Sequence, residues 1–220
     1  MRLTPTNSVR RASLTAAASL LAMAFIAGFA HFFLLTAESP IALFRLGVAS
    51  FVVVVILDIV VAWALLTVLI VIDQGWAILA AWFRVAFAAV FAVAIGVLAQ
   101  PLPGSADGTF RASTLETFDA IWTVGLILFG MHLLVVGVLV AGPSVAEKVV
   151  GILLVIAGLG YVVDGFGFVL MPELSVAVSE YTFVGEVVFI GWLFVKGGAR
   201  GWPRARSHVT PAATATEGEK

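Results

Sequence analysis

The stretch that decides the fold is "IALFRLGVASFVVVVILDIVVAWALLTVLIVI", residues 41–72. It contains two charged residues, Arg45 and Asp58, and no proline. About 20 apolar residues are enough for a helix to cross the hydrocarbon core of a bilayer, and this run is longer. Its apolar residues are continuous rather than alternating, which argues against the strands of a membrane β-barrel. The stretch therefore predicts a transmembrane helix.

The rest of the chain repeats this pattern. Of its 220 residues, 62% are hydrophobic and 11% are charged, whereas a typical soluble domain has about 25% charged residues. The apolar runs are Leu14–Thr36, Ile41–Ile72, Gly75–Ala99, Asp119–Ala141, Val145–Met171 and Val176–Val195. All eight prolines lie outside these runs, as expected because proline removes a hydrogen bond from a helix interior. We therefore predict an all-α, polytopic integral membrane bundle of six transmembrane helices.

Basic residues at the ends of the runs indicate the orientation, because cytoplasmic loops carry an excess of lysine and arginine. Nine basic residues lie on the side that would hold both termini, against Arg45 and Arg111 on the other side. We expect both termini in the cytoplasm and a multi-pass protein of the inner (plasma) membrane. The predicted domains are a cytoplasmic N-terminal segment (1–13), a six-helix transmembrane domain (14–196) and a disordered cytoplasmic tail (197–220).

The composition argues against several chemistries. The chain has no cysteine, which excludes disulfides, thiolate metal sites and cysteine nucleophiles. Its net charge of −1 gives no case for nucleic acid binding, and no nucleotide-binding or hydrolase motif occurs. His31 and His132 differ by roughly 12 Å in predicted depth, which is too far for two axial ligands of one haem. We expect the lipid bilayer as partner, with a small-molecule ligand as a further candidate, and no cofactor or metal. A non-enzymatic role is favoured over an intramembrane enzyme, and the oligomeric state stays open.

Seven ionisable residues lie at or within the predicted spans. A charged group costs about 2.5 to 3.5 kcal/mol at the centre of a bilayer, so such groups usually face the bundle interior and find partners. The predicted outer half holds His31, Arg45, Asp164 and Glu186, and the region near the midplane holds Asp58, Arg84 and His132. Each layer contains an arginine and a carboxylate. This predicts pairs of Arg45 with Asp164 or Glu186, and of Asp58 with Arg84.

Charge counting leaves one carboxylate unmatched, because two arginines face three acids if both histidines are neutral. A protonated carboxyl, a cationic histidine, or a bound cation or polar ligand would balance it, and the proton is the least costly. Tyr161 lies one helical turn before Asp164, so we expect its hydroxyl to donate to that carboxylate. The candidates for a ligand or proton site are Arg45, Asp164, Glu186, His31 and Tyr161, and the candidates for intramembrane pairing are Asp58, Arg84 and His132.

Two functions from different classes fit these residues. The first is an integral membrane protein with a buried polar site in the outer half of its bundle, which binds or transports a small solute or a proton. The alternative is a structural or regulatory membrane component whose intramembrane charges only tie helices together.

Four segments also resemble a known family. They are "LFRLGVASFVVVVILDIVVAWALL", "AILAAWFRVAFAAV", "GLILFGMHLLVVGVLV" and "VVGILLVIAGLGYVVDGFGFVLMP". Together they resemble the bacterial multi-pass membrane family catalogued as domain of unknown function 4386, over most of the chain. The most specific positions are Arg45, Arg84, His132 and Asp164. The resemblance implies a membrane fold and supports this choice of polar residues, but it implies no activity, because the family has none established.

Overall fold

The computed structural model describes residues 5–36, 38–100, 108–171 and 177–198. Within these ranges the chain is helical and contains no strand. The elements are α1 (Pro5–Phe29), the π-helical η1 (Ala30–Leu34), α2 (Ile41–Leu69), α3 (Gln74–Leu98), α4 (Gly108–Val140), α5 (Val145–Leu170), α6 (Ser179–Thr182) and α7 (Val184–Gly198). The predicted tail, 197–220, lies outside the described residues apart from its first two positions.

Five helical segments in the described residues are long and apolar enough to cross a membrane. They are Asn7–Leu34, Ile41–Leu69, Gln74–Leu98, Phe110–Val140 and Val145–Leu170. The chain is therefore an all-α, multi-pass membrane bundle, as the sequence predicts.

The last predicted span, Val176–Val195, takes a different form. Its described part, 177–195, holds the single turn α6 and most of α7, a helix of 15 residues that ends at Gly198. A helix of that length is about 22 Å long, against a hydrocarbon core of about 30 Å. The sixth helix is therefore shorter than the other five and is interrupted near its start.

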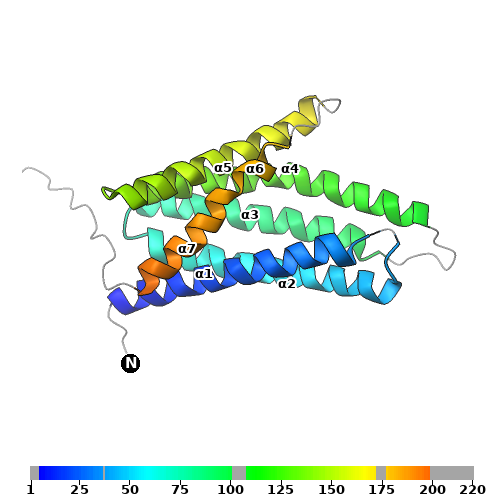
Figure 1. Ribbon diagram of the computed structural model, residues 1–220, viewed down its shortest axis with the longest axis horizontal. Coiled ribbons are helices and arrows are strands. Elements are labelled where there is room, and N and C mark those ends of the chain that lie inside the picture. Colours follow the sequence, from blue (N-terminus) through cyan, green and yellow to red (C-terminus); the bar gives the residue numbers. More distant parts are fainter. Residues whose placement is uncertain (1–4, 37, 101–107, 172–176, 199–220) are drawn as a thin grey trace, which may run out of the picture.

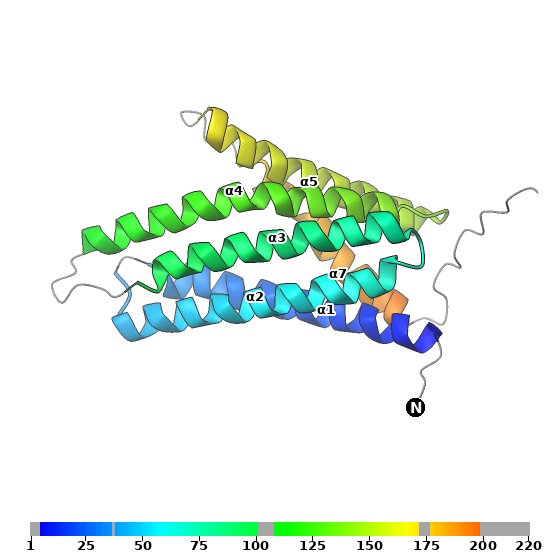
Figure 2. The same cartoon turned by 180° about the vertical axis from the view of Figure 1, so that it is seen from behind.

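The helices form a closed ring in which each helix packs against its neighbours in the sequence. α7 closes this ring, because it contacts both α5 and α1. Figure 1 shows α7 in orange crossing obliquely between the α4–α5 pair and α1, and Figure 2 shows α2, α3 and α4 from behind. α1 begins and α7 ends at the same end of the bundle, here called the terminal end. The opposite end, where α2 begins, is called the far end.

Glycines set the close approach of α4 and α5. A Cβ atom at Gly130 would lie 2.6 Å from the carbonyl oxygen of Gly158, and one at Gly137 would lie 2.8 Å from that of Gly151. Both helices therefore place glycine at a spacing of seven residues, and the two pairs face each other across the antiparallel interface. Small residues at such interfaces let membrane helices pack backbone to backbone. The sequence has no G-x-x-x-G within a predicted span, so the close contact uses a longer period instead.

The approach of the last helices to α5 also depends on glycine. A Cβ atom at Gly160 would collide with Oγ1 of Thr182, and one at Gly185 would collide with the carbonyl oxygen of Leu153. These two contacts bring the start of α7 directly against the middle of α5. They therefore determine which polar side chains of α5 and α7 can meet.

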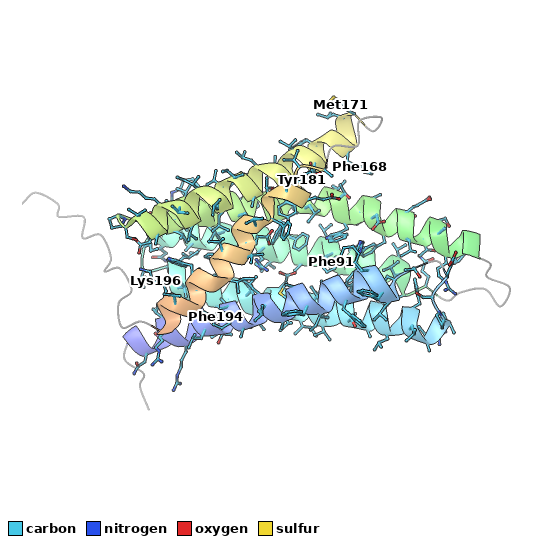
Figure 3. All side chains as sticks on the ribbon, viewed as in Figure 1. Phe91, Phe168, Met171, Tyr181, Phe194 and Lys196 are labelled. Carbon is cyan, nitrogen blue, oxygen red and sulfur yellow. The ribbon has the colours of Figure 1, made fainter. Side chains whose placement is uncertain are left out.

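The interior of the ring is aromatic. Its buried phenylalanines are Phe51, Phe87, Phe91, Phe118 and Phe129, and contacts among them have ring centroids 5.1 to 6.1 Å apart. Phe91, on α3, is labelled in Figure 3, and its ring contacts those of Phe51 on α2 and Phe118 on α4. The outer surface is apolar too, as a surface that faces lipid must be: Trp63 is 60% exposed and Trp82 is 73% exposed.

Candidate functional site

The predicted pair of Asp58 and Arg84 is present in the structure. Nη2 of Arg84, on α3, lies 2.6 Å from Oδ1 of Asp58, on α2, and the two side chains are 2% and 1% exposed. Asp58 is 17 residues from the start of α2, about 26 Å along a helix of about 43 Å. The pair therefore lies in the middle of the bundle. Two charges so far from water are tolerated because each offsets the desolvation of the other.

His132, on α4, extends this pair to a third helix. Its Nδ1 lies 2.8 Å from the carbonyl oxygen of Ala80, and its Nε2 lies 3.3 Å from Nη1 of Arg84. A carbonyl oxygen can only accept and a guanidinium can only donate. Nδ1 must therefore carry the proton and Nε2 must be bare, so these contacts require a neutral imidazole. The arginine also stacks over Phe129, with its guanidinium carbon 5.4 Å from the ring centre.

Tyr161, on α5, and Glu186, on α7, lie in the same region of the bundle. The Tyr161 hydroxyl donates a hydrogen bond of 2.7 Å to Oε1 of Glu186. The Tyr161 ring packs edge-on against Phe129, at a centroid distance of 5.2 Å. Glu186 lies close enough to Arg84 and Asp58 for their charges to act on it. We call Asp58, Arg84, His132, Tyr161 and Glu186 the central polar cluster; it takes one residue from each of five helices.

The central polar cluster is not balanced within itself. Asp58 and Glu186 supply two acidic groups and Arg84 supplies one positive charge, while His132 is neutral in this geometry. Oδ2 of Asp58 and Nε of Arg84 are buried and have no hydrogen-bond partner among the described residues. A buried polar atom without a partner costs about 1 to 3 kcal/mol. The cluster therefore has one acidic group more than its positive charge balances, and it has buried polar atoms that could accept or donate a further hydrogen bond.

Asp164 does not have the predicted partners. Its Oδ1 accepts a hydrogen bond of 2.8 Å from the backbone N–H of Val178, and its Oδ2 accepts one of 2.7 Å from the backbone N–H of Ser179. The carboxylate therefore holds the amides at the start of α6, where a helix leaves its first N–H groups unpaired. The predicted pairing with Arg45 is wrong, and so is the predicted bond from Tyr161, whose hydroxyl donates to Glu186 instead.

Arg45 and His31 lie apart from the central polar cluster. Arg45 is exposed and lines a groove at the far end, between α2 and α3. His31 is part of η1, and its ring lies 5.7 Å from that of Trp122 and near the charge of Asp119. The predicted site of five residues therefore has one contact among its members, the bond between Tyr161 and Glu186. Tyr161 and Glu186 instead lie beside Asp58, Arg84 and His132, which were predicted only to pair, so the candidate site is central rather than in the outer half of the bundle.

Glu147 is a polar tie that the sequence analysis did not select. Its Oε1 lies 2.6 Å from Nζ of Lys196, and it forms a reciprocal capping box with Ser144 at the start of α5. The segment "SVAE", residues 144–147, matches the usual S-x-x-E signature of this motif, so the helix cap could have been predicted from the sequence. The ion pair with Lys196 could not have been predicted in the same way, because Lys196 lies on a different helix, α7. Figure 3 shows Lys196 near the terminal end of α7, beside the start of α5.

Metal binding finds no support in the part of the chain that the structure describes, since no group of three histidine, cysteine or acidic side chains there could hold an ion. The side chains of the central polar cluster are suited to proton exchange at a carboxyl and to hydrogen bonding with a small solute. The groups that could take part are the carboxyl of Glu186 and the two unpartnered atoms, Oδ2 of Asp58 and Nε of Arg84.

Comparison with known proteins gives a consistent result. The model of the family described as Domain of unknown function (DUF4386) matches residues 14–197. An uncharacterized protein of Archaeoglobus fulgidus is 33% identical over 144 residues, which cover 66% of this chain and 79% of that protein. No solved structure shows a significant match. The chain therefore belongs to the family Domain of unknown function (DUF4386).

Proposed function

We propose that this membrane protein binds a proton or a small solute at the central polar cluster, with Glu186 as the group that accepts it and Tyr161 as the group that orients Glu186. The observation that carries the proposal is the excess of one acidic group over positive charge in this cluster. A net buried charge is costly in a bilayer, so a proton or a bound cationic or polar species has a strong reason to occupy the site.

Glu186 is a better acceptor than Asp58. Asp58 is 1% exposed and is fixed by its ion pair with Arg84, whereas Glu186 is partly exposed and is held by one hydrogen bond from Tyr161. Glu186 also lies on α7, the shortest of the ring helices. A protonated Glu186 could still accept the Tyr161 bond at its carbonyl oxygen. The exchange therefore requires no rearrangement of the pair.

Infrared difference spectroscopy on the purified protein tests this assignment, because a protonated carboxyl has its own carbonyl band. We expect a band that titrates with pH in the wild type, is lost in Glu186→Gln and is kept in Asp164→Asn. Asp164 is the matched control, since its carboxylate is occupied by two backbone amides. A band that disappears in Asp58→Asn and survives in Glu186→Gln would place the proton on Asp58 and overturn the assignment.

A thermal-shift screen with small cations and polar solutes tests whether the central polar cluster binds a solute rather than a proton. A ligand that binds the folded protein raises its melting temperature by mass action. We expect such stabilisation to depend on Glu186 and to survive in Asp164→Asn. If neither a titrating band nor any stabilising solute depends on Glu186, the proposal fails.

The structural alternative has an observation of its own. Arg84 contacts Asp58 on α2 and His132 on α4 at once, so it ties three consecutive helices of the ring together. The same residues could serve only that purpose. This alternative predicts no titrating carboxyl and no ligand, and it is therefore separated from the first proposal by the same two measurements.

A further inference from the structure

We propose that the groove between the far ends of α2 and α3 binds an anionic phospholipid, with its phosphate at Arg45 and an acyl chain along the apolar wall. The groove has a volume of about 390 Å³, and its apolar wall includes Ile41, Phe44, Val48 and Leu98. That volume falls within the range of small-molecule sites, roughly 300 to 1,000 Å³. This site is separate from the central polar cluster.

The depth of Arg45 suits a phosphate group. α2 has 29 residues, so it is about 43 Å long and extends about 6 Å beyond a hydrocarbon core of about 30 Å at each end. Arg45 is four residues from the start of α2, which is also about 6 Å. For an α2 that is centred in the bilayer and perpendicular to its plane, the Cα of Arg45 lies at the boundary between hydrocarbon and headgroups, and its exposed side chain can reach the layer that holds lipid phosphates.

The charges around the groove favour an anion. None of the residues that line it is acidic. A second cation lies behind its wall, because the guanidinium carbon of Arg111 is 5.3 Å from the ring centre of Phe44. Arginine binds phosphate oxygens through parallel N–H groups, and Gln100, whose side chain has an amide that can donate, also lines the groove.

The walls favour a lipid over a soluble anion. Ile41 is 41% exposed and Val48 is partly exposed, and they line the groove together with the buried Phe44 and Leu98, so the groove presents apolar surface next to a positive charge. Inorganic phosphate could use the charge but gains nothing from this apolar surface. A phospholipid uses both, because its acyl chain covers apolar surface while its headgroup meets Arg45.

Native mass spectrometry of the full-length protein in detergent tests the site by titration with dioleoyl phosphatidylglycerol. Dioleoyl phosphatidylcholine, which has the same chains and no net charge, and inorganic phosphate are the comparison ligands. We expect phosphatidylglycerol to bind more tightly than either. Arg45→Gln should weaken phosphatidylglycerol binding roughly five-fold, the effect expected for one arginine near an anionic lipid.

Two matched controls distinguish binding in this groove from nonspecific binding of the lipid to any positive charge or any apolar surface of the protein. Lys148→Gln removes one exposed positive charge at the terminal end and should leave phosphatidylglycerol binding unchanged. Ala99→Phe, directly after the end of α3, fills the groove without changing charge and should weaken binding, whereas Ala92→Phe, at an exposed position of α3 outside the groove, should not. Equal affinity of wild type, Arg45→Gln and Ala99→Phe would overturn the proposal, as would preference for inorganic phosphate.

Discussion

The Tyr161 hydroxyl donates a hydrogen bond to Glu186 at 2.7 Å, and this bond joins α5 to α7 where the ring of helices closes. The two residues are 25 positions apart in the sequence. They meet because Gly160 and Gly185 let the start of α7 approach the backbone of α5. The polar contact at the centre of the protein therefore depends on the small residues beside it.

Removing the Tyr161 hydroxyl should destabilise the protein modestly. Tyr161→Phe keeps the ring contact with Phe129 and removes only the donor to Glu186. Interhelical hydrogen bonds in membranes contribute about 0.6 kcal/mol on average and up to about 1.7 kcal/mol. We expect a loss in this range in the free energy of unfolding, measured by denaturant titration in mixed micelles.

The control for this variant is a double-mutant cycle with Glu186→Leu, which removes the acceptor. The coupling energy between positions 161 and 186 should match the loss in Tyr161→Phe alone. Strictly additive effects of the two substitutions would show that this hydrogen bond does not stabilise the folded protein.

Breaking the ion pair of Asp58 and Arg84 should be far more costly. Asp58→Leu removes the carboxylate that contacts the buried guanidinium directly, and breaking a buried pair by removing one partner costs about 3 to 5 kcal/mol. Adding Arg84→Met removes both charges and should restore most of the folded yield, since apolar replacement of a buried pair is often neutral. Size-exclusion profiles and the yield of detergent-soluble protein report the result.

The restoration should be incomplete because of His132. Without Arg84, its Nε2 has lost its donor and becomes a buried acceptor, at a cost of about 1 to 3 kcal/mol. The triple variant that adds His132→Leu should therefore fold better than the double variant. If the double variant folds no better than Asp58→Leu alone, the pair does not account for the stability at this position.

Five of the six helices could be predicted from the sequence, because a long apolar run without proline in a bilayer favours a spanning helix. The run Val176–Val195 is also apolar and free of proline, yet it is divided into α6 and the shorter α7. The pair of Asp58 and Arg84 could be predicted for a similar reason. Two opposite charges at the same depth in a bilayer lower the desolvation cost of both when they form an ion pair. The partners of Asp164 could not be predicted, because they are the backbone amides of Val178 and Ser179. Every residue except proline has such an amide, so the sequence does not indicate which amides a carboxylate binds. The contact of Tyr161 with Glu186 depends on where α7 crosses α5, which periodicity alone does not give.

Loss of the Asp164 carboxylate should loosen the start of α6 rather than the whole bundle. Asp164→Ala frees the N–H groups of Val178 and Ser179, and loss of a helix cap costs about 0.5 to 2 kcal/mol. Asp164→Asn keeps one carbonyl acceptor and should cost less. Hydrogen exchange followed by mass spectrometry should show faster exchange in the peptide that contains Val178, with α3 unchanged as an internal control. Equal acceleration in α3 would contradict a local capping role.

The glycines between α4 and α5 should be intolerant of the smallest possible addition. A Cβ atom at Gly158 would lie 2.7 Å from the carbonyl oxygen of Gly130 and 3.0 Å from the backbone nitrogen of Leu134, so Gly158→Ala must push the two backbones apart. Overpacking of this kind costs about 1 to 3 kcal/mol. The loss should appear in the free energy of unfolding, measured in the same micelles as the Tyr161 variants.

Gly96→Ala is the matched control, because Gly96 is also inside a helix but a Cβ atom there would meet nothing within 4 Å. Alanine has a higher helix propensity than glycine, so this variant should gain about 0.5 to 1 kcal/mol or stay neutral. Opposite signs for the two substitutions would show that close backbone approach, rather than helix propensity, explains glycine at Gly158. A gain at both positions would mean that α4 and α5 can separate freely, and the spacing of seven residues would then have no structural role.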